Sequence, residues 1–158
     1  MSTRKPLIAG NWKLFKTGSE AVETAEKLVG LVQCADHTEV MIAPPFTALA
    51  QVSEAVKGTN VALGAQNLFW EAEGAFTGEI SPRMLRQLCR YVILGHSERR
   101  GLFGETDENV NRKIHAAFEY GMTPIVCVGE NLEQNRAGGT VAFVGRQVRA
   151  ALKGVSPE

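Results

Sequence analysis

The sequence predicts an α/β protein with a parallel sheet, and two patterns carry this prediction. Five short apolar segments recur along the chain, centred on Ile8, Ile42, Leu63, Ile93 and Val126. They do not alternate with polar residues, which is typical of strands buried on both faces of a parallel sheet. An amphipathic segment follows each of them, so strand and helix alternate five times. Right-handed crossovers then make neighbouring strands parallel.

The expected helices begin at capping sequences. These are Thr17 with Glu20, Thr47, Ser81 with Pro82, Thr106, and Gly138-Gly139-Thr140. Side-chain oxygens and proline are favoured at such starts because the first N–H groups of a helix lack intrahelical partners. No linker or low-complexity tract interrupts the pattern, so residues 1–158 are predicted to form a single domain.

Two architectures fit this order. One is an open, doubly wound sheet of flavodoxin type, and the other is part of a (β/α)8 barrel. Length alone favours the open sheet, since five units in 158 residues make a complete domain of that kind. In both architectures the functional groups lie at the carboxyl ends of the strands.

Composition narrows the classes of partner. Seventeen basic and seventeen acidic residues cancel, so no overall charge favours nucleic acid or an anionic membrane. No apolar run approaches the roughly 20 residues of a membrane span, and the first six residues lack the apolar stretch of a signal peptide. A cytoplasmic protein without nucleic-acid or membrane partners is the expectation.

Cysteines and two of the three histidines predict no chemistry. Cys34, Cys89 and Cys127 lie far apart with no CxxC spacing, so neither a disulfide framework nor a zinc site is indicated. We expect buried free thiols in a reducing compartment. His37 falls in a loop and His115 on a helix, and both are interpreted as incidental.

Polar residues follow the first strand directly. The strand ends in Asn11-Trp12-Lys13, where a nucleotide-binding protein would carry a glycine-rich turn. Lys13 would place a cation beside a ligand, and Asn11 would donate to a ligand oxygen. Taken alone, the motif is better explained as a surface lysine that follows a strand.

The fourth strand runs into Gly95-His96-Ser97-Glu98-Arg99-Arg100. Ser97 is placed to cap a short helical turn, which would bring the His96 ring close to exposed N–H groups and disfavour its cationic form. A neutral imidazole suits proton transfer near neutral pH. The alternative is that Glu98 and the two arginines form a solvated ion-pair cluster.

A long loop after the third strand is rich in glycine and aromatic residues. It covers residues 67–79 and contains Phe69, Trp70 and Phe76. Exposed aromatic rings are unusual in a solvated loop, and loops of this length are often functional. Either the loop folds back on its own domain or it docks into a partner.

Together these stretches resemble the triosephosphate isomerase family. The matching pieces are Ala9-Gly10-Asn11-Trp12-Lys13, Gly64-Ala65-Gln66-Asn67, Gly74-Ala75-Phe76-Thr77-Gly78-Glu79, the segment from Tyr91 to Arg100, and Cys127-Val128-Gly129-Glu130, in the family's order and spacing. The resemblance implies a (β/α)8 TIM barrel, present here as an incomplete barrel of about five βα units. It also implies a homodimer that interconverts dihydroxyacetone phosphate and D-glyceraldehyde 3-phosphate through an enediolate, without cofactor or metal.

The resemblance also implies residue roles. Asn11 and Lys13 match substrate-binding positions, where an ammonium stabilises the phosphate and the enediolate. His96 matches the neutral electrophile, and Glu98 matches the acidic residue that orients the site. Phe76, Thr77 and Gly78 match the loop tip that reaches the neighbouring subunit. Docking into a partner is therefore the preferred reading of the 67–79 loop.

One family feature has no counterpart in this sequence. The family's general base is a glutamate on the sixth unit, and Glu158 stands in the wrong context to replace it. The expectation is negligible isomerase activity for this chain alone, with open edges on the first and fifth strands. The alternatives are a non-catalytic barrel fragment that keeps the dimer loop and a flavodoxin-like binding module.

Overall fold

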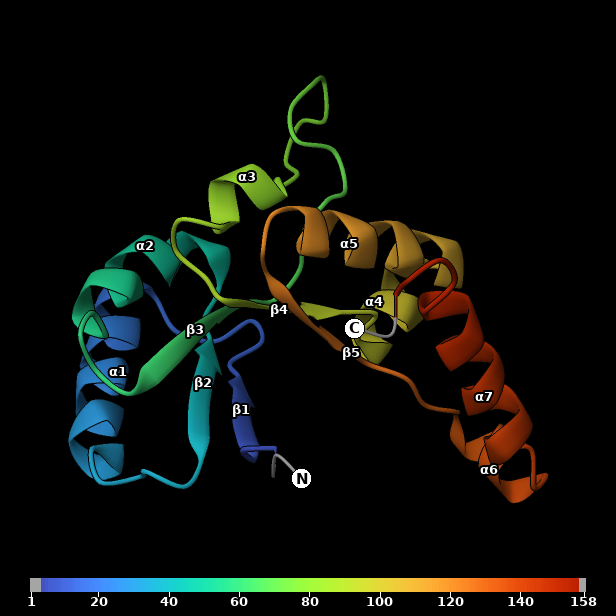
Figure 1. Cartoon of the computed structure of the whole chain (residues 1–158), viewed down its shortest axis with the longest axis horizontal. Coiled ribbons are helices and arrows are strands. Elements are labelled where there is room, and N and C mark those ends of the chain that lie inside the picture. Colours follow the sequence, from blue (N-terminus) through green and yellow to red (C-terminus); the bar gives the residue numbers. More distant parts are fainter. Residues whose placement is uncertain (1–3, 157–158) are drawn as a thin grey trace.

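The computed structural model describes residues 4–156. Glu158 and the start of the segment screened for a signal peptide therefore lie outside the described residues. Five parallel strands form one curled sheet, with helices along its outer side (Figure 1). The strands are β1 (Leu7–Asn11), β2 (Glu39–Ala43), β3 (Val61–Ala65), β4 (Tyr91–Leu94) and β5 (Thr123–Val126). All five predicted strands are confirmed.

The strand order decides between the two architectures. The order is β1-β2-β3-β4-β5, with each strand beside its neighbour in the chain. A flavodoxin-type sheet has the order 2-1-3-4-5, so that alternative is wrong. Consecutive order with outer helices is the arrangement of an incomplete (β/α)8 barrel, as the family resemblance implied.

The two ends of this sheet are open edges among the described residues, as expected. β1 pairs only with β2, and β5 only with β4. Leu7 is 37% exposed and Ile8 63% exposed on β1. The prediction of strands buried on both faces is therefore wrong for β1 and for β5, neither of which has a fully buried residue, because an edge strand has a neighbour on one side only.

The helices are α1 (Gly18–Val32), α2 (Phe46–Ala55), α3 (Pro82–Leu85), α4 (Ser97–Leu102), α5 (Asp107–Glu119), α6 (Leu132–Arg136) and α7 (Thr140–Ala151). Ser81 and Thr106 cap α3 and α5 as predicted. Thr47 does not cap α2, which begins one residue earlier, after Pro45. The short helical turn expected after the fourth strand is present as α4, with 6 residues. The sequence did not predict α6, because a helix of 5 residues shows no periodicity. Among residues 4–156 no helix is long and apolar enough to cross a membrane.

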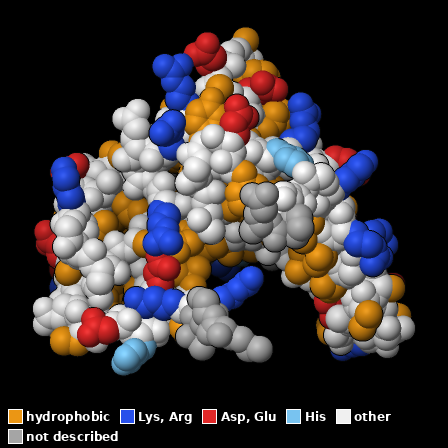
Figure 2. All heavy atoms as spheres, in the orientation of Figure 1, with side chains coloured by type: hydrophobic (Ala, Val, Ile, Leu, Met, Phe, Trp, Pro, Cys, Tyr) orange, Lys and Arg blue, Asp and Glu red, His pale blue; other side chains and the backbone are white. Residues whose placement is uncertain are grey.

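Two apolar layers hold the sheet. The larger lies between the strands and the outer helices, and a smaller one on the concave side contains Met41, Ala43, Tyr91 and Ile93. A Cβ on Gly64 would stand 2.7 Å from the Met41 sulfur, so glycine lets Met41 lie across β3 and become fully buried. Hydrophobic side chains are visible in the hollow of the arc (Figure 2).

Candidate active site

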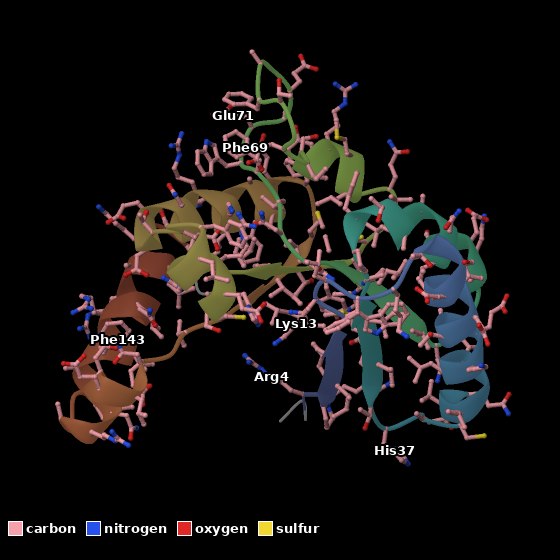
Figure 3. All side chains as sticks on the ribbon, turned by 180° about the vertical axis from the view of Figure 1, so that it is seen from behind. Arg4, Lys13, His37, Phe69, Glu71 and Phe143 are labelled. Carbon is pink, nitrogen blue, oxygen red and sulfur yellow. The ribbon has the colours of Figure 1, made fainter. Side chains whose placement is uncertain are left out.

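A cleft of about 610 Å³ lies at the carboxyl ends of the strands. Its polar lining is Asn11, Lys13, Gln66, Asn67, Glu79, His96, Glu98 and Arg99. The predicted residues Asn11, Lys13, His96 and Glu98 therefore come together, although they arise from β1 and β4. Figure 3 marks Lys13 near the middle of the molecule, far from the labelled His37 below the sheet.

The exit of β1 is a tight turn built on Asn11. The Asn11 side-chain oxygen accepts a hydrogen bond from the Lys13 N–H at 2.9 Å. Lys13 has φ +52°, in the left-handed region that is unfavourable for a side chain. Gln66, from the exit of β3, donates from its Nε2 to the carbonyls of Lys13 and Ala43, both at 2.9 Å. Gln66 thus fixes the turn, a role that the sequence did not predict.

The exit of β4 places the His96 ring at the start of α4. His96 itself is the N-cap, and its Nδ1 lies 3.3 Å from the Glu98 N–H. The prediction that Ser97 caps this turn is therefore wrong. The Glu98 carboxylate also lies 3.4 Å from Nδ1, a contact that is attractive only when Nδ1 carries a hydrogen. We assign Nδ1 as an acceptor because a backbone N–H can only donate, and the hydrogen of the neutral ring is then on Nε2.

Lys13 and Glu98 form an ion pair across the cleft. The Lys13 Nζ lies 2.9 Å from the Glu98 Oε1, and the two side chains are 48% and 45% exposed. The hydrogen bond from Lys13 is the main cause that lowers the pKa of Glu98 below its usual 4.5, and the positive charge of Lys13 lowers it further. Solvent screens a pair this exposed, so it adds little to the stability of the fold.

Behind the β4 exit lies a buried ionic network that the sequence did not predict. The Glu105 carboxylate accepts from the Gly95 N–H at 3.1 Å and pairs with Lys113. Lys113 also donates to the Asn67 side-chain oxygen at 2.8 Å. Burial is the main cause that lowers the pKa of Lys113. The sequence contains one sign of this network: Lys113 lies between the apolar positions Val110 and Ile114 on the buried face of α5.

Arg100 joins the exits of β4 and β5. Its guanidinium donates to the Gly95 carbonyl at 2.7 Å, to Asp107 at 2.6 Å and to the Cys127 carbonyl at 3.4 Å. A solvated ion-pair cluster therefore does not describe Arg100, which is mostly buried. Gly95 itself has φ +70°, and a Cβ there would stand 2.9 Å from the Arg100 Nη2.

The 67–79 loop projects from the body of the molecule between β3 and α3 (Figure 1). The Phe69 ring packs on Trp70 and Phe76, with centroids 4.1 and 4.7 Å away. The Arg112 guanidinium lies 4.2 Å from the Trp70 centroid. The loop thus packs in part on its own chain, whereas Phe76, Thr77 and Gly78 are exposed. Figure 3 shows Phe69 and Glu71 on this projection.

The remaining cysteines and histidines lie outside the cleft. Cys89 is buried, and burial raises the pKa of its thiol to about 12. Cys34 is exposed, so the expectation of a buried thiol is wrong there. The His115 Nε2 lies 3.0 Å from the Lys153 carbonyl. Among residues 4–156, no three His, Cys, Asp or Glu side chains gather where they could hold a metal ion.

The consecutive parallel strands and the polar cleft at their carboxyl ends define a barrel-type α/β protein whose functional groups stand on strand exits. The family model for triosephosphate isomerase matches residues 6–158. This chain therefore belongs to the triosephosphate isomerase family.

Similarity to individual members is high. The chain is 55% identical to the triosephosphate isomerase of Caldanaerobacter subterraneus subsp. tengcongensis over 156 residues, which cover 98% of this chain and 62% of that protein. It is 55% identical to that of Acetivibrio thermocellus over 157 residues, covering 99% and 62%. The crystal structure of the Bartonella henselae triosephosphate isomerase superposes with a TM-score of 0.89 at 34% identity, covering 97% of this chain and 64% of that one. The chain thus spans less than two thirds of these relatives.

Proposed function

We propose that this chain carries the electrophilic and substrate-binding side of a triosephosphate isomerase site. The reaction interconverts dihydroxyacetone phosphate and D-glyceraldehyde 3-phosphate by proton transfer through an enediolate. The observation that supports this most is the convergence of Asn11, Lys13, His96 and Glu98 on one cleft at the strand ends. Family membership supports the same reaction.

The proposed roles follow from the free donors of each group. The Lys13 ammonium meets the phosphate and the growing negative charge of the enediolate. A fixed cation stabilises that charge more than it stabilises the uncharged carbonyl group of the substrate. Asn11 uses its oxygen on the Lys13 N–H, which leaves its NH₂ to donate to a substrate oxygen. Glu98 holds the Lys13 ammonium in place.

His96 acts on the two substrate oxygens. Its Nδ1 is engaged by the Glu98 N–H, so Nε2–H is the donor that polarises the carbonyl and passes a proton between the oxygens. We assign no carbon-proton transfer to Glu98, because the lowered pKa makes its carboxylate a weak base. This supports the expectation that the 158-residue chain alone turns over substrate negligibly.

The proposed partner is a second copy that receives the tip of the 67–79 loop. Phe76, Thr77 and Gly78 are exposed on a base that is already packed. The cleft wall carries Phe15, 70% exposed, and Phe103, 67% exposed. An inserted tip would cover these rings and exclude water from Lys13 and His96. Three free cysteines fit a reducing compartment, and we propose the cytoplasm.

The test is calorimetric titration with a phosphorylated hydroxamate, which mimics the enediolate. We expect binding by the chain that Lys13→Met weakens at least about tenfold and that the surface control Lys57→Met leaves unchanged. No binding by the unaltered chain would favour the non-catalytic barrel fragment. In a protein extended to the family's full barrel, His96→Gln should lower turnover by about 10²-fold or more with the fold retained.

A further inference from the structure

We infer that Glu105 and Lys113 are a positioning pair that joins the strand exit carrying His96 to the root of the 67–79 loop. The inference rests on the proposed function for the importance of His96 and of the loop. Neither residue of the pair lines the cleft. It acts through the backbone of Gly95 and the side chain of Asn67.

The two oxygens of Glu105 divide between the two segments. Its Oε2 accepts from the Gly95 N–H at 3.1 Å, one residue before His96. Its Oε1 pairs with Lys113 and lies 3.5 Å from the Arg99 Nε. Lys113 then donates to the Asn67 Oδ1 at 2.8 Å, at the first residue of the loop. An unbroken series of hydrogen bonds therefore runs from the β4 exit to the loop.

Burial makes this series stiff. Glu105 and Lys113 are 7% and 4% exposed, so water does not compete for their bonds. A buried ion pair is often no more stabilising than apolar residues of similar volume, and stability alone does not require one here. An apolar pair would fill the space, but it would leave the Gly95 N–H and the Asn67 oxygen without these partners.

The consequence is mechanical coupling between two functional parts. A displacement of Asn67 moves Lys113, and Glu105 transmits it to Gly95 and hence to the His96 ring. Docking of a second copy on the loop would thus change the orientation of the His96 imidazole. Arg112, the residue before Lys113, contacts the loop through Trp70 and Glu71 but makes no bond to Glu105.

The experiment compares Lys113→Met with Arg112→Met in the 158-residue chain, labelled with ¹⁵N in its histidines and amides. Lys113→Met should shift the His96 Nδ1 resonance and speed amide exchange in residues 67–79 by about tenfold or more, with unchanged far-UV circular dichroism. Arg112→Met should speed exchange in the loop and leave the His96 resonances in place. Unshifted His96 signals in folded Lys113→Met, or equal shifts in both variants, would overturn the inference.

Asn67→Ala decides the matter if Lys113→Met does not fold. It removes only the loop end of the series and leaves the pair with Glu105 intact. The His96 Nδ1 resonance should still move, and an unmoved resonance would contradict the coupling. These readouts need neither turnover nor ligand, so a failed hydroxamate titration would refute the proposed function without touching this result.

Discussion

The exits of β1 and β4 bring charged or titratable groups to the same cleft, but the molecule holds them in different ways. β4 is buried at every residue, and its exit is bonded from behind by Glu105 and Arg100. β1 is an edge strand with Ile8 63% exposed. Its exit is held by the local Asn11 turn and by Gln66 from the exit of β3, two strands away.

The difference follows from position in the sheet. A strand inside the sheet has outer helices behind it, and the buried charges there are Glu105, from the turn before α5, and Lys113 on α5. An edge strand has a neighbouring strand on one side only. Its exit must therefore be fixed by its own turn and by residues from the strands on that side. We therefore expect His96 to depend on distant, buried residues and Lys13 to depend on local backbone geometry. Substitutions on the two strands should differ in size accordingly.

The largest contrast should come from truncating an apolar side chain on each strand. Leu94→Ala empties a fully buried position on β4 and should lower the free energy of unfolding by about 2–5 kcal/mol. Ile8→Ala on β1 should change it by less than about 0.5 kcal/mol, as for other exposed sites. Urea unfolding measures both. Equal losses would mean that another chain covers β1 in solution, which light scattering would reveal.

A smaller effect is expected at the glycine of the β4 exit. Gly95→Ala forces a side chain into φ +70° and places its Cβ 2.9 Å from the Arg100 Nη2 and 3.2 Å from the Cys127 carbonyl. The loss of stability should be about 2–3 kcal/mol.

The matched control is Gly101→Ala in α4, where a Cβ meets nothing within 4 Å. Alanine there should be neutral or stabilise by about 0.5 kcal/mol. If both alanine variants unfold at the same urea concentration, the β4 exit is less constrained than its contacts indicate.

The same contrast explains what the sequence could predict. Strand segments and the Ser81 and Thr106 caps are set by neighbours in the chain, and these predictions are confirmed. The gathering of Asn11, Lys13, His96 and Glu98 follows from parallel strands, whose carboxyl ends share one edge. The choice between open sheet and barrel needed the strand order, which depends on pairing between distant segments.

The misses have the same cause. Lys113 lies 46 residues from Asn67, and no local rule links them. Serine is a usual N-cap residue, so the sequence favours Ser97 over His96 as the cap of α4. The His96 ring can accept the Glu98 N–H only because the β4 exit turns the ring toward it. The exposure of β1 likewise depends on which strands stand beside it.

At the β1 exit, relief of backbone strain should be measurable. Lys13→Gly removes the side chain from φ +52°, a gain of roughly 1–2 kcal/mol that the greater freedom of glycine in the unfolded chain offsets by about 0.5–1 kcal/mol. We expect a net stabilisation of about 0.5 kcal/mol in thermal unfolding, together with loss of hydroxamate binding. A lower unfolding temperature for Lys13→Gly would contradict this prediction and would show that the Lys13 side chain stabilises the fold.

The smallest effect concerns the titration of Glu98. Its folded-state pKa lies below 4.5, chiefly because Lys13 donates to it, so Lys13→Met should raise that pKa toward 4.5 in a ¹³C NMR titration of the carboxyl groups. Between the two pKa values the unfolded chain binds more protons, so stability rises with pH there. The contribution of the pair is therefore complete above pH 4.5 and is lost as pH falls through the lowered value.

Glu23 is the internal control, because its pKa is lowered mainly by Lys27 on α1. Its titration should not move in Lys13→Met. A Glu98 titration that also stays in place would show that the ammonium of Lys13 is not held in the cleft, and the β1 exit would then have to order its cation only when substrate binds.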